Sequence, residues 1–282
     1  MQVTLGVIGL GLIGGSLALD LKHRGYVGRV LGVENNPGNA ETALRMGLVD
    51  QVVSQEECIG KADIIVVAVP VGTAVKLIPA ILDKIGPRQL VIDVCSTKSQ
   101  ICHAVKYHSR RPQFVSTHPM AGTEYSGPGA AQTGLFDGRA CIFADAEQSA
   151  PQAVKAVEEL YRVLNMRLTF MNADQHDVHT AYVSHISHVT SFALALTVLE
   201  KEKDEKHIFD LASGGFASTV RLAKSNADMW VPILTQNRDN MLQVMDTYMK
   251  EIQQFRDAIA TFDEARLREL ITEANKIKRI LK

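Results

Sequence analysis

The sequence places an ionisable ring in a segment that has no means of burying it in a regular core. His118 lies in STHPMAGTEYSG, residues 116–127, which has neither helical nor strand periodicity. The ordinary pKa of histidine, about 6.5, suits proton transfer near neutral pH. Ser96 lies in DVCSTK, residues 93–98, directly after an apolar run. His118 is therefore a candidate general base, and Ser96 could orient it or a substrate hydroxyl. The alternative is that His118 only caps a loop.

A glycine-rich turn near the N-terminus predicts a dinucleotide site. Residues 9–14 read GLGLIG, which matches GxGxxG, follows a predicted strand and opens a predicted helix. Gly9 permits the tight turn, Gly11 lets the backbone approach a pyrophosphate, and Gly14 lets the helix pack on the strand. The other expected cofactor contacts of this turn are Leu12 and Ile13. The alternative is a glycine turn in an unrelated sheet, which this context disfavours.

The residue that ends the second strand selects between two cofactors. Glu34 lies twenty residues after Gly14, where a carboxylate accepts hydrogen bonds from the adenosine ribose and repels a 2′-phosphate. This predicts NAD rather than NADP, although Arg29 and the nearby asparagines could rearrange around a phosphate. Pro70 is expected to border the cofactor, on topology alone.

Strand-like and helical segments alternate through residues 1–171. Strands are predicted at 3–10, 29–35, 62–70 and 89–96, and helices at 13–25, 37–47 and 73–86. The strands are continuously apolar, which is typical of a parallel sheet buried on both faces. The pattern predicts a doubly wound, Rossmann-type α/β domain. Residues 113–119, 139–145 and 166–172 can extend its sheet. Ligands bind such sheets at the carboxyl ends of the strands, which places Ser96 and His118 on one rim.

The pattern changes to helices alone over residues 172–282. Helical segments are predicted at 172–200, 205–225, 228–257 and 263–281. Asn172 and Asp174 are candidate N-caps of the first, which is expected to pack directly on the α/β domain. The chain is therefore expected to have two domains, 1–171 and 172–282. Long amphipathic helices at the end of a chain often form a dimer interface, but the same apolar stripes could form an internal core.

The composition indicates an ordinary globular protein. Hydrophobic residues make up 46%, charged residues 22%, and the formal net charge is −1. Nucleic-acid binders normally carry a large basic excess, so none is expected here. The four cysteines show no CxxC spacing and are interpreted as reduced core thiols. No signal-like segment or apolar run of about 20 residues stands out. We expect a cytoplasmic protein that does not span a membrane.

Five segments in order resemble the prephenate/arogenate dehydrogenase family of tyrosine biosynthesis. HPMAGTEYSG resembles a family motif, with DVCSTK upstream and GLGLIGGS at the start of the chain. In the second half, YVSHISH at 182–188 resembles the SHxxH helix motif of the family. FASTVRLAKSNADMW at 216–230 resembles its arginine-containing segment. The resemblance spans nearly the whole chain.

The resemblance implies a role for each matching residue. His118 would be the catalytic histidine, bonded to the ring hydroxyl of the substrate, and Ser96 would bridge that hydroxyl, His118 and the nicotinamide. Arg221 would bind a substrate carboxylate. Ser184 and His188 would assist Arg221. Glu124 would lie at the mouth of the site, and Trp230 would be an aromatic residue near Arg221. Prephenate is a dianion, and a guanidinium can hold a carboxylate through two hydrogen bonds.

The activity implied is NAD-dependent oxidative decarboxylation of prephenate to 4-hydroxyphenylpyruvate, CO₂ and NADH, by a homodimer. Prephenate is preferred to arogenate because the NAD-type Glu34 accompanies prephenate use more often in this family. A non-catalytic redox sensor of the same fold is an alternative. A 3-hydroxyacid dehydrogenase is another, but it would place a lysine on the first helix of the second domain, and residues 173–200 contain none.

The histidine-rich helix raises the question of a metal. We expect no metal, because hydride transfer to NAD needs none and a third ligand in register is not evident. The helix histidines outside the family motif positions, His176, His179 and His185, are interpreted as surface or core residues.

Overall fold

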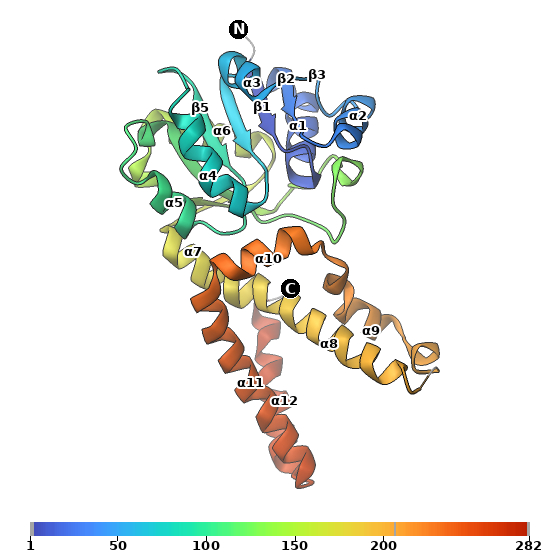
Figure 1. Cartoon of the computed structure of the whole chain (residues 1–282). Helices are drawn as coiled ribbons and strands as arrows, with labels where there is room; N and C mark the ends of the chain where they lie inside the picture. Colours follow the sequence, from blue (N-terminus) through green and yellow to red (C-terminus); the bar gives the residue numbers. More distant parts are fainter. Residues whose placement is uncertain (1–2, 206, 281–282) are drawn as a thin grey trace. The chain divides into compact units, whose positions relative to one another are not determined.

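The structure is a computed structural model that describes residues 3–205 and 207–280. Its described residues contain one eight-stranded sheet in the order β3-β2-β1-β4-β5-β6-β7-β8 (Figure 1). The strands are β1 Val3–Ile8, β2 Val27–Val33, β3 Gln51–Val52, β4 Ile64–Val67, β5 Leu90–Asp93, β6 Phe114–Pro119, β7 Ala140–Ala144 and β8 Arg167–Met171. Strands β1 to β6 run parallel, β7 is antiparallel to β6, and β8 is parallel to β7. The predicted doubly wound α/β fold followed by helices is confirmed.

Helices cover both faces of this sheet. The helices up to residue 163 are α1 Leu12–His23, α2 Pro37–Arg45, α3 Gln55–Lys61, α4 Val71–Leu82, α5 Ser99–Val105 and α6 Pro151–Val163. Alternate residues of β4 join different cores: Ile64 belongs to the core that includes residues of α1 and α6, and Ile65 to the core that includes residues of α3, α4 and α5. Burial on both faces explains why the strands are continuously apolar.

The rest of the chain is helical. These helices are α7 Ala173–Thr180, α8 Ile186–Glu202, α9 Gly214–Thr219, α10 Ala227–Gln236, α11 Arg238–Ala260 and α12 Glu264–Ala274. Asn172 caps α7 through a reciprocal pair of hydrogen bonds with Gln175, as expected, whereas Asp174 lies in the first turn and is not the cap. As predicted, α7 packs on the sheet domain, because Asp177 accepts hydrogen bonds from the amides of Lys98 and Ser99.

Three of the predicted helical segments are not continuous α-helices. Residues 205–225 form only short helical pieces, with α9 between the 3₁₀ turns Ile208–Leu211 and Arg221–Lys224. The segment 228–257 breaks at Asn237, between α10 and α11. Within 263–281, α12 is followed by the 3₁₀ turn Asn275–Arg279. Residues 206 and 281 of these predictions lie outside the described residues.

The chain divides into two compact units, Met1–Asn237 and Arg238–Lys282. The first holds the sheet and the helices up to α10, including Trp230 and Ile233, which are buried against α4. The second contains α11 and α12, joined by a hydrogen bond from Arg266 to Gln254 at 2.5 Å. The expected domain boundary at residue 172 stays a prediction.

Candidate active site

A cavity of about 480 Å³ lies at the carboxyl ends of β1, β4, β5 and β6, entirely within the first unit. The strand order reverses between β1 and β4, and open α/β sheets bind ligands at that point. Ten of the fourteen predicted site residues line the cavity: His118, Ser96, Arg221, His188, Ser184, Trp230, Gly11, Leu12, Ile13 and Pro70. Residues more than 200 positions apart in the sequence thus meet around one space.

Three predicted cofactor residues lie behind the lining. Gly9 has a φ of 96°, and a Cβ on Gly14 would come within 2.1 Å of the Gly9 carbonyl oxygen, so both glycines are required by the turn. The carboxylate of Glu34 accepts hydrogen bonds from the amides of Leu10 at 3.2 Å and Asn36 at 3.0 Å. Glu34 therefore lies directly against the glycine turn.

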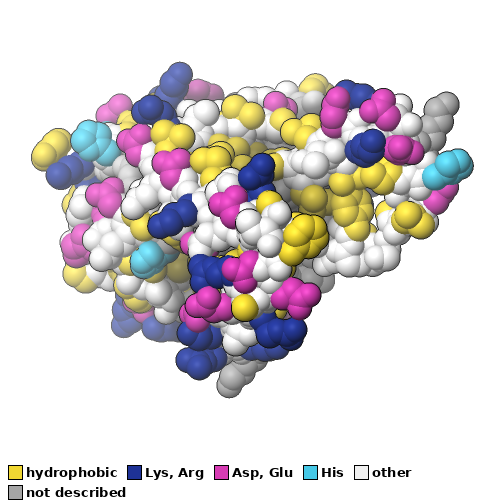
Figure 2. Space-filling view, turned by 90° about the horizontal axis from the view of Figure 1, so that it is seen from below, with side chains coloured by type: hydrophobic (Ala, Val, Ile, Leu, Met, Phe, Trp, Pro, Cys, Tyr) yellow, Lys and Arg dark blue, Asp and Glu magenta, His cyan; other side chains and the backbone are white. Residues whose placement is uncertain are grey.

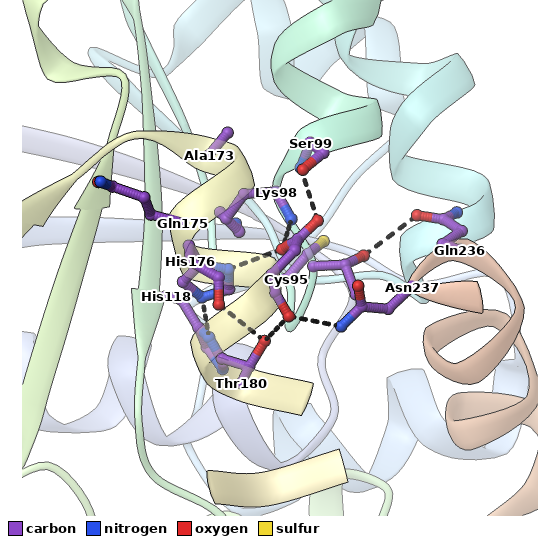
Figure 3. A network of polar contacts seen from close by, with 12 residues as sticks. Cys95, Lys98, Ser99, His118, Ala173, Gln175, His176, Thr180, Gln236 and Asn237 are labelled. Atoms are coloured by element: carbon purple, nitrogen blue, oxygen red, sulfur yellow. Dashed lines mark hydrogen bonds and ion pairs between the residues drawn. The ribbon is translucent and has the colours of Figure 1, made fainter. Parts of the chain in front are cut away.

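His118 is held from behind by a second histidine. Its Nδ1 lies 2.8 Å from Nε2 of His176, and Nδ1 of His176 lies 2.7 Å from Oδ1 of Asp177. Figure 3 shows His118 and His176 facing one another, with His176 on α7. Burial, with the nearby positive or ionisable groups of His176, Lys98 and His185, lowers the pKa of His118 well below 6.5. The ring is therefore neutral at neutral pH, as a base must be.

A buried ion pair lies beneath this histidine. The ammonium of Lys98 contacts the carboxylate of Asp93, and both side chains are fully buried. Lys98 also donates to the carbonyl of Thr117 at 2.6 Å, and the hydroxyl of Ser116 donates to Asp93 at 2.8 Å. These bonds join the end of β5 to β6, so the strand that carries His118 is fixed in relation to the loop that carries Ser96.

A π-helical turn, Ala181–His185, joins α7 to α8. The amide of Ile186 donates to the carbonyl of Ala181, five residues back, so this turn takes up one extra residue. His176 and His188 are twelve positions apart, which in an unbroken α-helix would separate them by about 120° around the axis. One extra residue reduces that to about 20°, so His176, behind His118, and His188, in the cavity wall, lie on one side of the same helical segment.

Arg221 reaches the cavity from the 3₁₀ turn that follows α9. Its Nη1 lies 2.9 Å from the carboxylate of Glu124, and the Arg221 side chain is 50% exposed. Glu124 itself is not among the lining residues but lies at the cavity edge, between Thr123 and Tyr125, which are. The hydroxyl of Ser191 on α8 donates to the carbonyl of Thr219 at 3.0 Å, which ties the end of α9 to α8.

His188 stacks on the indole of Trp230, with ring centroids 3.5 Å apart. Burial lowers the pKa of His188, with Arg221 adding to the effect and the bond to Ser184 opposing it. Its Nδ1 lies 3.2 Å from the carbonyl oxygen of Ser184, so this nitrogen carries the proton and donates. A neutral His188 therefore presents Nε2 as an acceptor, and it must gain a proton before that nitrogen can donate to a carboxylate.

Comparison with known proteins agrees with this geometry. Residues 17–170 match the family model described as "Prephenate dehydrogenase, nucleotide-binding domain", and residues 172–273 match "Prephenate dehydrogenase, dimerization domain". The prephenate dehydrogenase of Bacillus subtilis is 31% identical over 270 residues, which are 95% of this chain and 73% of that protein. The chain belongs to the prephenate dehydrogenase family. It is an NAD-dependent oxidoreductase of that family.

Two solved structures of the prephenate dehydrogenase family resemble this chain. The prephenate dehydrogenase of A. aeolicus, in complex with hydroxyphenyl propionate and NAD⁺, has a TM-score of 0.89 at 26% identity and covers 99% of this chain and 98% of its own. The arogenate dehydrogenase of Synechocystis has a TM-score of 0.76 at 26% identity and covers 99% and 100%. Dehydrogenases named for prephenate and for arogenate thus both occur among similar structures.

The residues around the glycine turn fit NAD. A Cβ on Gly11 would meet no described atom within 4 Å, so the backbone there faces open space in the cavity wall. Gly11 is the N-cap of α1 and offers no side chain to its first-turn amides, which remain for a pyrophosphate. Arg29 donates to Gln51 at 2.6 Å and lies five residues before Glu34, about 16 Å along the strand. Its partner and its place on the strand disfavour the alternative in which Arg29 binds a 2′-phosphate.

His176 and Asp177 are the site residues that the sequence did not reveal. The interpretation of His176 as a surface or core residue missed its bond to His118. His185 is indeed buried and His179 exposed. Adjacent residues of a helix point about 100° apart, so HD at 176–177 gives no periodic signal of a shared role. A histidine followed by aspartate at the start of a helix is a weak hint at most.

Two further properties concern the described part of the chain only. It holds no group of three or more His, Cys, Asp or Glu side chains placed to bind a metal ion. The stretch Ala173–Glu202, by length and composition alone, is apolar enough to cross a membrane, a test that core helices of soluble proteins also pass. The same stretch carries four of the site residues discussed above, namely His176, Asp177, Ser184 and His188.

Proposed function

We propose that this chain catalyses the oxidative decarboxylation of prephenate to 4-hydroxyphenylpyruvate and CO₂ with NAD as the oxidant. The observation that carries the proposal is one cavity that joins the glycine turn, a neutral buried histidine and an arginine. Its volume of about 480 Å³ is within the usual range for small-molecule sites.

The binding step depends on Arg221. Its guanidinium holds a carboxylate of the dianion in place of Glu124, its partner in this structure. The hydroxyl of Ser184 is a second donor in the cavity wall. His188 adds a stacked wall with Trp230 and an acceptor nitrogen. The substrate ring then lies between these helices and the strand ends that carry Ser96 and His118.

The chemical step begins at Nε2 of His118. This nitrogen takes the proton of the C4 hydroxyl, and Ser96, on the same rim, orients that hydroxyl. NAD held at the turn of Gly9, Gly11 and Gly14 would supply the acceptor for the hydride of C4. The C4–O bond becomes a carbonyl, the ring carboxylate departs as CO₂, and its bonding electrons move through the ring to the oxygen. His118 returns the proton to that oxygen, so the base is restored within the turnover and the ring is aromatic.

An assay that measures both NADH and the product tests the proposal directly. Purified protein is mixed with NAD and prephenate, the absorbance of NADH is followed, and 4-hydroxyphenylpyruvate is identified by chromatography. Stoichiometric NADH and product are expected. A protein that binds NAD with no turnover of either prephenate or arogenate would leave the redox-sensor alternative in its place.

Arogenate is the second candidate substrate. Asp228 lines the cavity and forms no ion pair within the described residues, so its carboxylate is able to pair with the ammonium group of arogenate. The ratio of kcat/KM for the two substrates decides between them. We expect prephenate to be favoured and Asp228→Asn to weaken only the use of arogenate. A higher kcat/KM for arogenate in the unmodified protein would reverse the assignment.

We also propose that the chain acts as a homodimer in the cytoplasm. Support comes from the family description of residues 172–273 as a dimerization domain. Exposed apolar side chains on α8 and α11, such as Leu196 at 67% and Met249 at 56%, would be covered by a second copy. Figure 2 shows hydrophobic side chains exposed among charged ones on one face of the molecule. Light scattering should give twice the mass of the 30.9 kDa chain.

A further inference from the structure

We propose that His176 and Asp177 are positioning residues that fix the tautomer of His118, so that its Nδ1 carries the proton and its Nε2 faces the cavity as a bare acceptor. This inference rests on the proposed role of His118 as the base. It goes further by assigning the proton to one ring nitrogen and by naming the two residues that place it there.

The position of the proton on His118 follows from which atoms of Asp177, His176 and His118 can donate and which can accept. An ionised Asp177 can only accept, so Nδ1 of His176, at 2.7 Å, must donate to it. A neutral imidazole carries one proton, which leaves Nε2 of His176 as an acceptor. That nitrogen lies 2.8 Å from Nδ1 of His118, which must therefore carry the proton of the second ring. Nε2 of His118 is then unprotonated.

This assignment of protons requires that Asp177 is ionised. Its Oδ1 accepts from the amide of Lys98 at 2.7 Å, and its Oδ2 accepts from the amide of Ser99 at 2.9 Å. Burial alone would raise its pKa, but the hydrogen bonds from His176 and from both amides lower it overall. Both carboxylate oxygens thus accept from backbone amides, which favours the ionised form.

A neutral His176 is the second requirement. Burial lowers its pKa, although the bond to Asp177 opposes that effect, and the positive charge of Lys98 lowers it further. A doubly protonated His176 would instead donate from both nitrogens, and His118 would then carry its proton on Nε2. The buried ammonium of Lys98, fixed against Asp93, disfavours that state.

The third requirement is that Nε2 of His118 points into the cavity. His118 lines the cavity, and Nε2 has no hydrogen-bond partner in the described parts of the chain. The nitrogen is also not among the fully buried polar atoms that lack a partner there. It is therefore open to the cavity, where the substrate hydroxyl has to approach to within about 3 Å.

The same contacts hold the ring in place. Asp177 is tied by its side chain to the β5–α5 loop, and its carbonyl accepts from Asn237 at 2.7 Å. The hydroxyl of Thr180 donates to the carbonyl of His176 at 3.0 Å. Figure 3 shows Thr180 and Asn237 in one polar network with His176 and His118. Because His176 and Asp177 are fixed by these bonds, they limit rotation of the His118 ring before the substrate binds.

Nitrogen-15 NMR of histidine side chains tests the tautomer without turnover. The unmodified apoprotein is labelled with ¹⁵N-histidine, and His118→Asn identifies the signal of that ring. We expect the proton on Nδ1 and a nitrogen of unprotonated type at Nε2. A proton on Nε2 would overturn the inference whether or not the chain oxidises prephenate, so this result is independent of the proposed function.

Two substitutions of His176 distinguish the effect of its acceptor nitrogen from the effect of its volume. In His176→Gln the amide group can donate to Asp177 and present its oxygen to Nδ1 of His118, so the tautomer should persist and kcat should fall less than about tenfold. In His176→Leu the acceptor is gone, and we expect a loss in kcat of about 10²-fold, the lower end of what a general base contributes. The KM values for prephenate and for NAD should stay within about threefold of those of the unmodified protein.

His179→Leu is the matched control, because it makes the same change on the same helix at an exposed position. It should leave kcat and the His118 signal unchanged. A His176→Leu protein that keeps both kcat and the Nδ1 proton would contradict the proposal. If His176→Leu does not fold, the signal of the unmodified protein and the kcat of His176→Gln still decide, since a His176→Gln loss near 10²-fold would also contradict it.

Discussion

Replacing Arg221 with alanine should raise KM for the dianionic substrate and leave kcat nearly unchanged. The guanidinium lines the cavity but has no contact with His118, so it acts on binding rather than on the reacting atoms. A charge-assisted hydrogen bond is worth about 1.5–3 kcal/mol. The loss of one such bond corresponds to a factor of about 10 to 150 in KM.

The structure places the expected value near the lower end of that range. The Arg221 side chain is 50% exposed, so water screens its charge, and it must leave Glu124 before it can bind a carboxylate. We therefore expect KM to rise about 10- to 30-fold, with kcat within about threefold. Arg221→Lys should give an intermediate value, because an ammonium keeps the charge but not the planar fork.

Initial rates of NADH formation over a range of substrate concentrations give both constants. Lys224→Ala is the matched control: Lys224 is a cation of the same 3₁₀ turn and does not line the cavity. Its KM should change less than about threefold. An unchanged KM in Arg221→Ala would remove Arg221 from the carboxylate site. An equal rise in Lys224→Ala would show that only the general positive charge matters.

Three further predictions address the cofactor, acid stability and the buried ion pair. Glu34→Gln removes the charge that repels a 2′-phosphate, so the ratio of kcat/KM for NAD over NADP should fall about tenfold or more; an unchanged ratio would exclude Glu34 as the selecting residue. Burial lowers the pKa of His185 to about 4, so the unfolded chain binds a proton there between pH 6.5 and 4 while the folded chain does not. The free energy of unfolding should therefore fall by about 3 kcal/mol as the pH drops through that window, measured by urea denaturation, and His185→Gln should lose less. Lys98→Met leaves Asp93 buried without its partner and should cost about 3–5 kcal/mol of unfolding free energy, part of which Asp93→Asn in the same chain should recover.

The fold was largely predictable because its signals are local. Continuous apolar strands separated by helical segments require a parallel sheet, and the GxGxxG turn fixes where the first strand ends. The two-residue strand β3 and the reversal at β7 were not predicted, since strand direction depends on how distant segments meet. The predicted helix at 205–225 is broken into short pieces, and none of its described side chains is buried, so no single apolar stripe packs along it.

The candidate site was predictable only in part. His118, Ser96 and Arg221 were identified through motifs, and the structure brings all three to one cavity. The pairing of Arg221 with Glu124 and the bond from His118 to His176 could not be predicted, because both are tertiary contacts over 58 residues or more. The extra residue of the π-helical turn was not predicted, yet it changes which side chains of α7 and α8 lie on one side.

The measurement that tests the central claim most directly compares the unmodified protein with His118→Asn in the NADH assay with prephenate. The unmodified protein should form NADH and 4-hydroxyphenylpyruvate in equal amounts. His118→Asn should bind NAD as before but lose about 10²- to 10⁴-fold in kcat, the contribution of a general base. A variant that kept the full kcat would contradict the assignment of His118 as the base.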